Sequence, residues 1–135
     1  MITRSGLDPL EYQITGACIE VHKHLGPGLL ESVYQQYLSR EFQLRNIPHK
    51  SQHIVSVHYK GVMLDTALRT DFLIGSDLLV ELKAIESILP IHEAQILAYM
   101  KLLKVPKGLL MNFNCTNIIH HGKKSYVNEL YRELL

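Results

Sequence analysis

Asp71, Glu81 and Lys83 are the charged residues of this chain whose spacing best suggests chemistry. They fall in two otherwise apolar runs that flank Gly75-Ser76-Asp77, which is typical of a β-hairpin with a three-residue turn. In such a hairpin Asp71 stands opposite Glu81. Two carboxylates in that relation lie only ~5 Å apart at their Cβ atoms and repel each other, which destabilises a sheet. The sequence therefore predicts that a positive charge offsets this repulsion.

The same register predicts which face of the hairpin is buried. Ile74 pairs with Leu78, and Phe72 then faces Val80. Because side chains alternate between the faces of a strand, one face is almost wholly apolar. Its residues are Thr70, Phe72, Ile74, Leu78, Val80 and Leu82. The other face carries Leu73 and Leu79, then the two acids, then Arg69 and Lys83.

Two kinds of positive charge fit the acidic pair. A divalent cation such as Mg²⁺ takes oxygen ligands from one or two carboxylates and keeps waters for a substrate phosphate. Lys83, on the same face as Glu81, would then contact a scissile phosphate or the attacking water and stabilise developing charge. The alternative is a solvated salt-bridge cluster of Asp71, Arg69, Glu81 and Lys83. The local pattern leaves both interpretations open.

Composition and length predict one globular domain over residues 1–135, with 47% hydrophobic and 20% charged residues. No apolar stretch approaches the ~20 residues of a membrane span, and the first residues lack a signal-peptide hydrophobic region, so we expect a cytoplasmic protein with no membrane partner. The net charge of +1 means that any nucleic-acid contact must come from a local patch. Cys18 and Cys115 lack metal-ligand spacing and are expected to be buried reduced thiols.

Periodicity and capping signals predict the order of the elements. Asp8 and Pro9 begin a helix that Gly26-Pro27-Gly28 ends, and a second helix runs from about 29 to 44. Its expected apolar stripe is Leu30, Val33, Tyr34, Tyr37, Leu38 and Leu44. Strands are expected over residues 52–59, 62–74 and 78–83, a helix from Pro90 to about 103, strands over 108–113 and 117–121, and a terminal amphipathic helix carrying Val127, Leu130 and Leu134. This order predicts an α/β (α+β) fold with a central mixed β-sheet flanked by helices on both faces.

Further polar residues bear on the acidic pair. Glu31 falls in the first turn of the second helix, where an acidic residue also complements the helix dipole without any other role. Gln95 and Tyr99 are four residues apart on the helix after the hairpin and so share one face, with His92 a turn earlier. Each feature alone is a weak signal.

The order of these motifs resembles the GxxExxY family, within the PD-(D/E)XK nuclease superfamily, from Leu25 to Phe113. Gly28, Glu31 and Tyr34 match the motif that names the family. Asp71 with Glu81-Leu82-Lys83 matches the superfamily signature, although Thr70 stands where the nominal proline would be. Gln95 and Tyr99 are similar to the Gln-x-x-x-Tyr element of RecB-like nucleases, which helps to position substrate and lysine.

The resemblance implies a mixed-sheet nuclease core and a divalent cation, Mg²⁺ or Mn²⁺. Its implied ligands are Asp71, Glu81, the Leu82 carbonyl and, as a further acidic ligand, Glu31. Lys83 is the implied catalytic lysine, positioned with the substrate by Gln95 and Tyr99. The implied activity is phosphodiester cleavage of nucleic acid, with DNA favoured over RNA, and a homodimer is compatible with cutting duplex DNA.

A different class of function remains open on the same fold, namely a non-catalytic module that binds nucleic acid or a partner protein. The near-neutral charge supports it. Zinc binding is disfavoured at both pairs of neighbouring histidines. His22 and His24 are two residues apart on a predicted helix, where their side chains diverge, and His120 and His121 are adjacent on a predicted strand, where side chains alternate between faces. A local basic surface is expected from Lys101, Lys104, Lys107, Lys123, Lys124 and Arg132, although each alone is compatible with a solvated helix face.

Overall fold

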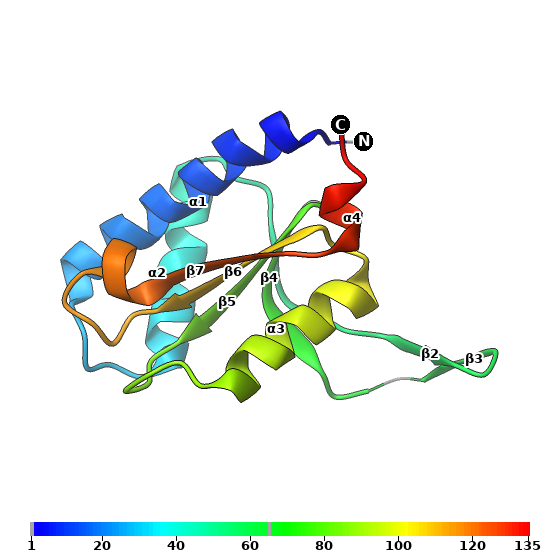
Figure 1. Ribbon diagram of the computed structural model, residues 1–135. Helices are drawn as coiled ribbons and strands as arrows, with labels where there is room; N and C mark the ends of the chain where they lie inside the picture. Colours follow the sequence, from blue (N-terminus) through cyan, green and yellow to red (C-terminus); the bar gives the residue numbers. More distant parts are fainter. Residues whose placement is uncertain (1, 65) are drawn as a thin grey trace.

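Helices cover both faces of a mixed sheet in the computed structural model, which describes residues 2–64 and 66–135 (Figure 1). The helices are α1 (Arg4–Leu25), α2 (Glu31–Leu44), α3 (Pro90–Leu103) and the single turn α4 (Glu129–Arg132). The strands are β1 (Lys50–Ile54), β2 (Val57–Tyr59), β3 (Val62–Leu64), β4 (Arg69–Ile74), β5 (Leu78–Lys83), β6 (Lys107–Asn112) and β7 (Lys123–Val127). A short π-helical segment, Ile118–Gly122, precedes β7.

The sheet topology explains why α3 lies where it does. Within the described residues, five strands form the main sheet in the order β1-β4-β5-β6-β7. Strands β5 and β6 are parallel, and all other neighbours are antiparallel. A parallel pair needs a long crossover, and α3 supplies it. The predicted mixed sheet with helices on both faces is confirmed.

Two hydrophobic cores follow from the alternation of side chains along the central hairpin. Phe72 and Val80 belong to the core under α1 and α2. Leu73 and Leu79 belong to the core under α3. The hairpin register is the predicted one, since Phe72 pairs with Val80, Leu73 with Leu79 and Ile74 with Leu78. Each strand of the hairpin therefore contributes to both cores, which fixes its register.

The first two helices differ in detail from the sequence prediction. Helix α1 begins at Arg4 and not at Asp8, because the Thr3 hydroxyl accepts the Gly6 N–H at 3.1 Å and caps the helix earlier. Pro9 consequently lies inside the helix. Helix α2 begins at Glu31. The predicted stripe of α2 is wrong at Leu30, Tyr37 and Leu44, which are exposed, whereas Phe42 completes the buried face with Tyr34 and Leu38.

The long strands predicted over residues 52–59 and 62–74 are each broken in two. Strands β2 and β3 form a two-stranded arm that projects from the molecule (Figure 1), with its turn at Lys60 and Gly61 as expected. The end of the chain also differs. Residues 118–121, which were expected in a strand, lie in the π-helical segment. The expected terminal helix is shortened to α4, because Val127 belongs to β7. Pairing with the otherwise open edge of β6 satisfies more backbone groups there than a short helix would.

Other sequence expectations concern the cysteines and the membrane. Cys18 and Cys115 are free thiols; Cys18 is buried as predicted, but Cys115 is partly accessible. Among the described helices, none combines the length and apolar character required to span a membrane. Figure 1 also shows the two termini side by side, and the Arg4 N–H donates to the Leu135 carbonyl at 3.0 Å.

Candidate metal centre and active site

Asp71 lies where the β4–β5 ladder ends. The last pair of the ladder is Phe72 with Val80, and the same register continued would place Thr70 opposite Leu82. Instead, the Leu82 N–H donates to Oδ2 of Asp71 at 2.7 Å. The Asp71 side chain thus takes the place of a backbone acceptor where the ladder ends.

This contact also sets the direction of the Leu82 carbonyl. In a strand, the N–H and C=O of one residue point to the same neighbouring strand. The Leu82 N–H faces Asp71 on β4, whereas the Lys83 carbonyl faces β6 and accepts the Phe113 N–H at 2.9 Å. The Leu82 carbonyl is therefore directed toward the side of β5 on which Asp71 lies.

Glu81 is an acid almost removed from water, at 5% exposure. Its Oε1 accepts a hydrogen bond from the Thr70 hydroxyl at 2.6 Å and another from the Asp71 N–H at 3.4 Å. Burial first, and then the negative charge of Asp71, raise the pKa of Glu81 to about 8 despite these donors. The metal-free site therefore holds a proton near neutral pH in place of a second negative charge.

The alternative prediction of a salt-bridge cluster formed by Asp71, Arg69, Glu81 and Lys83 is wrong. Among the described residues, no ion pair joins Arg69 or Lys83 to Asp71 or Glu81. The Arg69 guanidinium instead donates to the Gln52 carbonyl at 3.4 Å. Within the described residues, the two acids thus have no contacting side-chain cation.

Two side-chain hydrogen bonds in series connect Lys83 to α3. Its Nζ donates to Oε1 of Gln95 at 3.3 Å, and Nε2 of Gln95 donates to the Tyr99 hydroxyl at 3.3 Å. The four-residue spacing of Gln95 and Tyr99 on α3 brings both to the face that packs on the sheet. Tyr99 is buried, so its hydroxyl is a fixed acceptor for the Gln95 amide.

Glu31 enters the site from the first turn of α2. Burial raises the pKa of Glu31, the nearby negative charge of Asp71 raises it further, and Lys83 opposes both. The loop before α2 is braced by Tyr34, whose hydroxyl donates to the Gly26 carbonyl at 2.6 Å and accepts the Leu29 N–H at 3.2 Å. Gly28 adopts φ 97°, which glycine tolerates best. These contacts fix the start of α2 and so the place of Glu31.

Two hollows adjoin these residues. One, of about 540 Å³, is lined by Glu31, Ser32, Gln35, Gln36, Gln52 and Asp71. The other, of about 580 Å³, is lined by Lys83, Ile91, His92, Ala94, Gln95 and Ala98. Asp71, Glu31 and Lys83 are therefore reachable from solvent, whereas Glu81 lines neither hollow.

The donor set fits Mg²⁺ or Mn²⁺ better than zinc. Within the part of the chain that the structure describes, no three His, Cys, Asp or Glu side chains converge on a ready-made metal site. Mg²⁺ does not need one, because it is commonly bound by one or two carboxylates and keeps several waters. Two adjacent carboxyl groups beside a backbone carbonyl supply oxygen ligands of the kind that Mg²⁺ and Mn²⁺ prefer.

The family assignment agrees with this geometry. A family model described as the PD-(D/E)XK nuclease superfamily matches residues 8–124. The chain belongs to the PD-(D/E)XK nuclease superfamily. Members of this superfamily are usually nucleases and generally use divalent metal ions. No curated protein and no solved structure matches the chain significantly.

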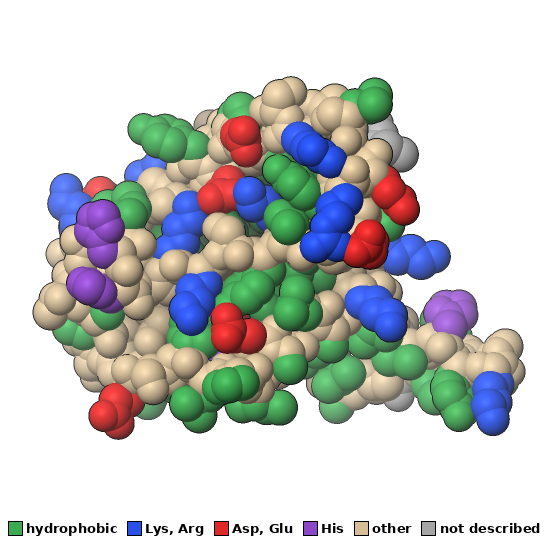
Figure 2. All heavy atoms as spheres, in the orientation of Figure 1, with side chains coloured by type: hydrophobic (Ala, Val, Ile, Leu, Met, Phe, Trp, Pro, Cys, Tyr) green, Lys and Arg blue, Asp and Glu red, His purple; other side chains and the backbone are tan. Residues whose placement is uncertain are grey.

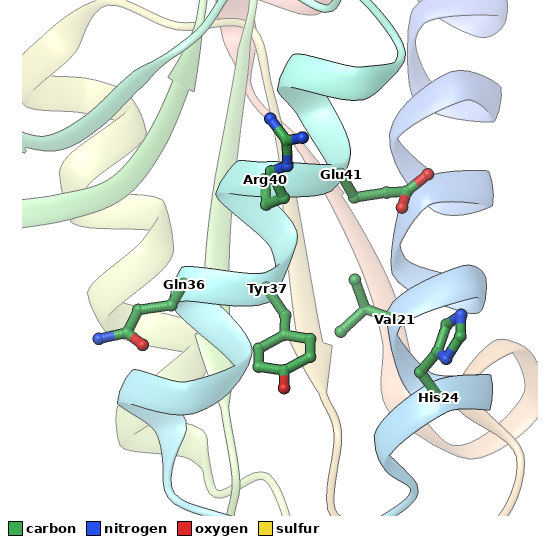
Figure 3. A pocket seen from close by; sticks show the side chains of 6 residues that line it. All are labelled: Val21, His24, Gln36, Tyr37, Arg40 and Glu41. Carbon is green, nitrogen blue, oxygen red and sulfur yellow. The ribbon is translucent and has the colours of Figure 1, made fainter.

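A further hollow, between α1 and α2, lacks the pair of acidic side chains found at the candidate metal site (Figure 3). Its volume is about 380 Å³, and its lining residues are Val21, His24, Gln36, Tyr37, Arg40 and Glu41. Glu41 is already paired with Arg45 at 2.6 Å, so the hollow provides no free pair of carboxylates.

The basic surface expected from the sequence is largely neutralised. Lys107 and Lys123 both pair with Glu11, and Lys124 lies 3.7 Å from Glu93. On the face seen in Figure 2, Lys and Arg side chains are interspersed with Asp and Glu.

Sequence reasoning missed residues that hold the acids. The Gln35 amide donates to the Asp71 backbone carbonyl at 3.2 Å, and Gln52 donates to Oδ1 of Asp71 at 3.2 Å. The position of Gln35, four residues after Glu31 on α2, was a usable signal. No comparable signal marked Gln52. Thr70 was expected to be a core residue, and its hydrogen bond to Glu81 was not foreseen.

Proposed function

We propose that the chain is a Mg²⁺- or Mn²⁺-dependent nuclease of the GxxExxY group that hydrolyses phosphodiester bonds in nucleic acid, with DNA favoured over RNA. One arrangement carries the proposal: Asp71 and the buried Glu81 are adjacent, Lys83 is held by Gln95, and among the described residues no basic side chain pairs with either acid. A structural acid pair would be expected to have a basic partner, whereas a metal site keeps its carboxylates available.

In this proposal Asp71, Glu81 and the Leu82 carbonyl hold the cation, and Glu31 is a further acidic ligand or a ligand to its waters. When bound, the ion would polarise a phosphoryl oxygen and lower the pKa of a water. Lys83 stabilises negative charge that develops on the phosphate. Gln95, fixed by Tyr99, restricts the ammonium group to the side of the site that the substrate reaches.

The proposal also covers the oligomeric state and the cellular compartment of the enzyme. A homodimer would supply the two active sites needed to cut both strands of a duplex, and the cytoplasm is the proposed compartment. Light scattering of the protein at working concentration measures the oligomeric state. A monomer that cleaves only single-stranded substrates would contradict the dimer.

The decisive experiment is cleavage of a mixed set of single- and double-stranded DNA and RNA in Mn²⁺. Lys83→Ala should abolish cleavage, while the matched control Lys23→Ala, at an exposed lysine of α1, should cleave as the wild type does. Binding of nucleic acid without cleavage by the wild type would favour a non-catalytic module. Cleavage that survives Lys83→Ala would remove the lysine from the mechanism.

A further inference from the structure

Gln52 has an unusual backbone for a residue inside a strand. Its φ is 51°, in the left-handed region, although it lies in the middle of β1. The neighbouring pairs Ser51 with Phe72 and His53 with Thr70 are formed, but the intervening pair of Gln52 with Asp71 is missing from the ladder. Residues other than glycine rarely adopt this conformation, and such strain persists where the surroundings enforce it.

The strained residue is directed at the acid of the candidate site. Nε2 of Gln52 donates to Oδ1 of Asp71 at 3.2 Å, and the Leu82 N–H occupies Oδ2 at 2.7 Å. The Arg69 guanidinium donates to the Gln52 carbonyl at 3.4 Å and so ties down the same peptide. Gln52 lines the hollow that also contains Glu31 and Asp71.

These contacts leave the carboxylate partly free. An ionised carboxylate has about four lone-pair sites on its two oxygens. Gln52 and Leu82 each occupy one site on a different oxygen, which fixes the plane of the group. The remaining sites are available to a cation, and the two hydrogen bonds favour one orientation of the carboxylate.

We propose that Gln52 is a positioning residue for the metal ligand Asp71, and that the left-handed backbone of β1 is retained because it brings the Gln52 amide onto that carboxylate. The inference rests on the proposed metal site. It explains why a glutamine occupies a position where glycine would be less strained: the side chain is used. Partners that orient a metal ligand commonly change metal affinity by roughly 10- to 100-fold when removed.

The test measures Mn²⁺ affinity by calorimetry and the melting temperature in EDTA for the wild type, Gln52→Ala and Gln52→Gly. Both substitutions should weaken Mn²⁺ binding by roughly tenfold or more. Gln52→Gly should melt higher than Gln52→Ala in EDTA, because glycine adopts the positive φ without strain. Gln36→Ala, in the same hollow but with no hydrogen bond to Asp71, is the matched control and should bind Mn²⁺ as the wild type does.

The outcomes separate this inference from the proposed function. Wild-type affinity in both Gln52 variants would overturn the positioning role, since a purely structural residue would change melting temperature alone. The same loss of affinity in Gln36→Ala would also overturn it, because the effect would then belong to the hollow in general. A wild-type protein that binds no Mn²⁺ would overturn the proposed function, and this inference with it.

Discussion

Glu81→Gln tests the electrostatic reasoning about the site most directly. Glutamine keeps the side-chain oxygen that accepts from the Thr70 hydroxyl and the Asp71 N–H, and it removes the ionisable proton. It therefore mimics protonated Glu81. The pKa of Glu81 is raised from 4.5 to about 8 by burial and by Asp71, so the metal-free wild type should be neutral at this position at pH 6 and ionised at pH 9.

The sign of the effect follows from proton binding in the two states. Between pH 4.5 and about 8 the folded protein holds a proton on Glu81 that the unfolded chain has lost. The stability contributed by this proton is fully present below pH 4.5 and is lost as pH rises through about 8. The wild type should lose about 1.4 kcal/mol of unfolding free energy per pH unit across that window, relative to Glu81→Gln.

The assay is denaturant unfolding of both proteins in EDTA from pH 5 to pH 9. The difference between them cancels the titration of groups common to both. The variant should become progressively more stable than the wild type as pH rises. A difference that does not change with pH would refute the raised pKa. Millimolar Mn²⁺ should stabilise the wild type at pH 8 and have little effect on the variant, because a ligand of the folded state stabilises by RT ln(1 + [L]/Kd).

Substitutions at three further residues separate the roles of Lys83, Thr70 and Asp71. Lys83→Met should abolish cleavage while leaving Mn²⁺ affinity in calorimetry nearly unchanged, and a joint loss would show that the lysine supports the ion. Thr70→Val should cost about 1–3 kcal/mol in denaturant unfolding, because buried Glu81 loses a donor. Thr70→Ser should restore most of that stability, and failure to do so would assign the cost to packing. At pH 9, where Glu81 is ionised, Asp71→Asn should raise stability in EDTA by about 1 kcal/mol through loss of carboxylate repulsion, and it should abolish stabilisation by Mn²⁺. A less stable variant with a normal Mn²⁺ response would contradict the metal site.

Local sequence was sufficient for the elements that carry the main chemistry. The hairpin of β4 and β5 could be predicted in register because a three-residue turn and alternating apolar residues act over short distances. Helix α3 was predicted with its observed bounds from Pro90 and its apolar run. Asp71, Glu81 and Lys83 share this hairpin, and Gln95 and Tyr99 share one helix face, so their grouping required little tertiary information.

Prediction from local sequence failed where the structure depends on contacts between segments that are distant in the chain. Val127 belongs to strand β7 and not to the expected terminal helix, because the edge of β6 needs a partner and only the assembled sheet presents that edge. Glu31 lies near Asp71 because the braced loop before α2 brings a distant helix to the end of the sheet. The left-handed Gln52 has no sequence signal, since its conformation is enforced by contacts with Arg69 and Asp71.

The sequence by itself therefore determined which acidic, basic and polar residues are candidates for the site, and it determined the hairpin that carries Asp71, Glu81 and Lys83. Alternation, turn preference and helical spacing depend on neighbours in the chain, and these can be read without a fold. The tertiary structure alone decided that Glu81 is buried with a raised pKa, that no basic side chain among the described residues pairs with it, and that two glutamines hold Asp71. Burial and charge pairing depend on which distant segments pack together, because removing water from a carboxylate requires surrounding atoms from several elements.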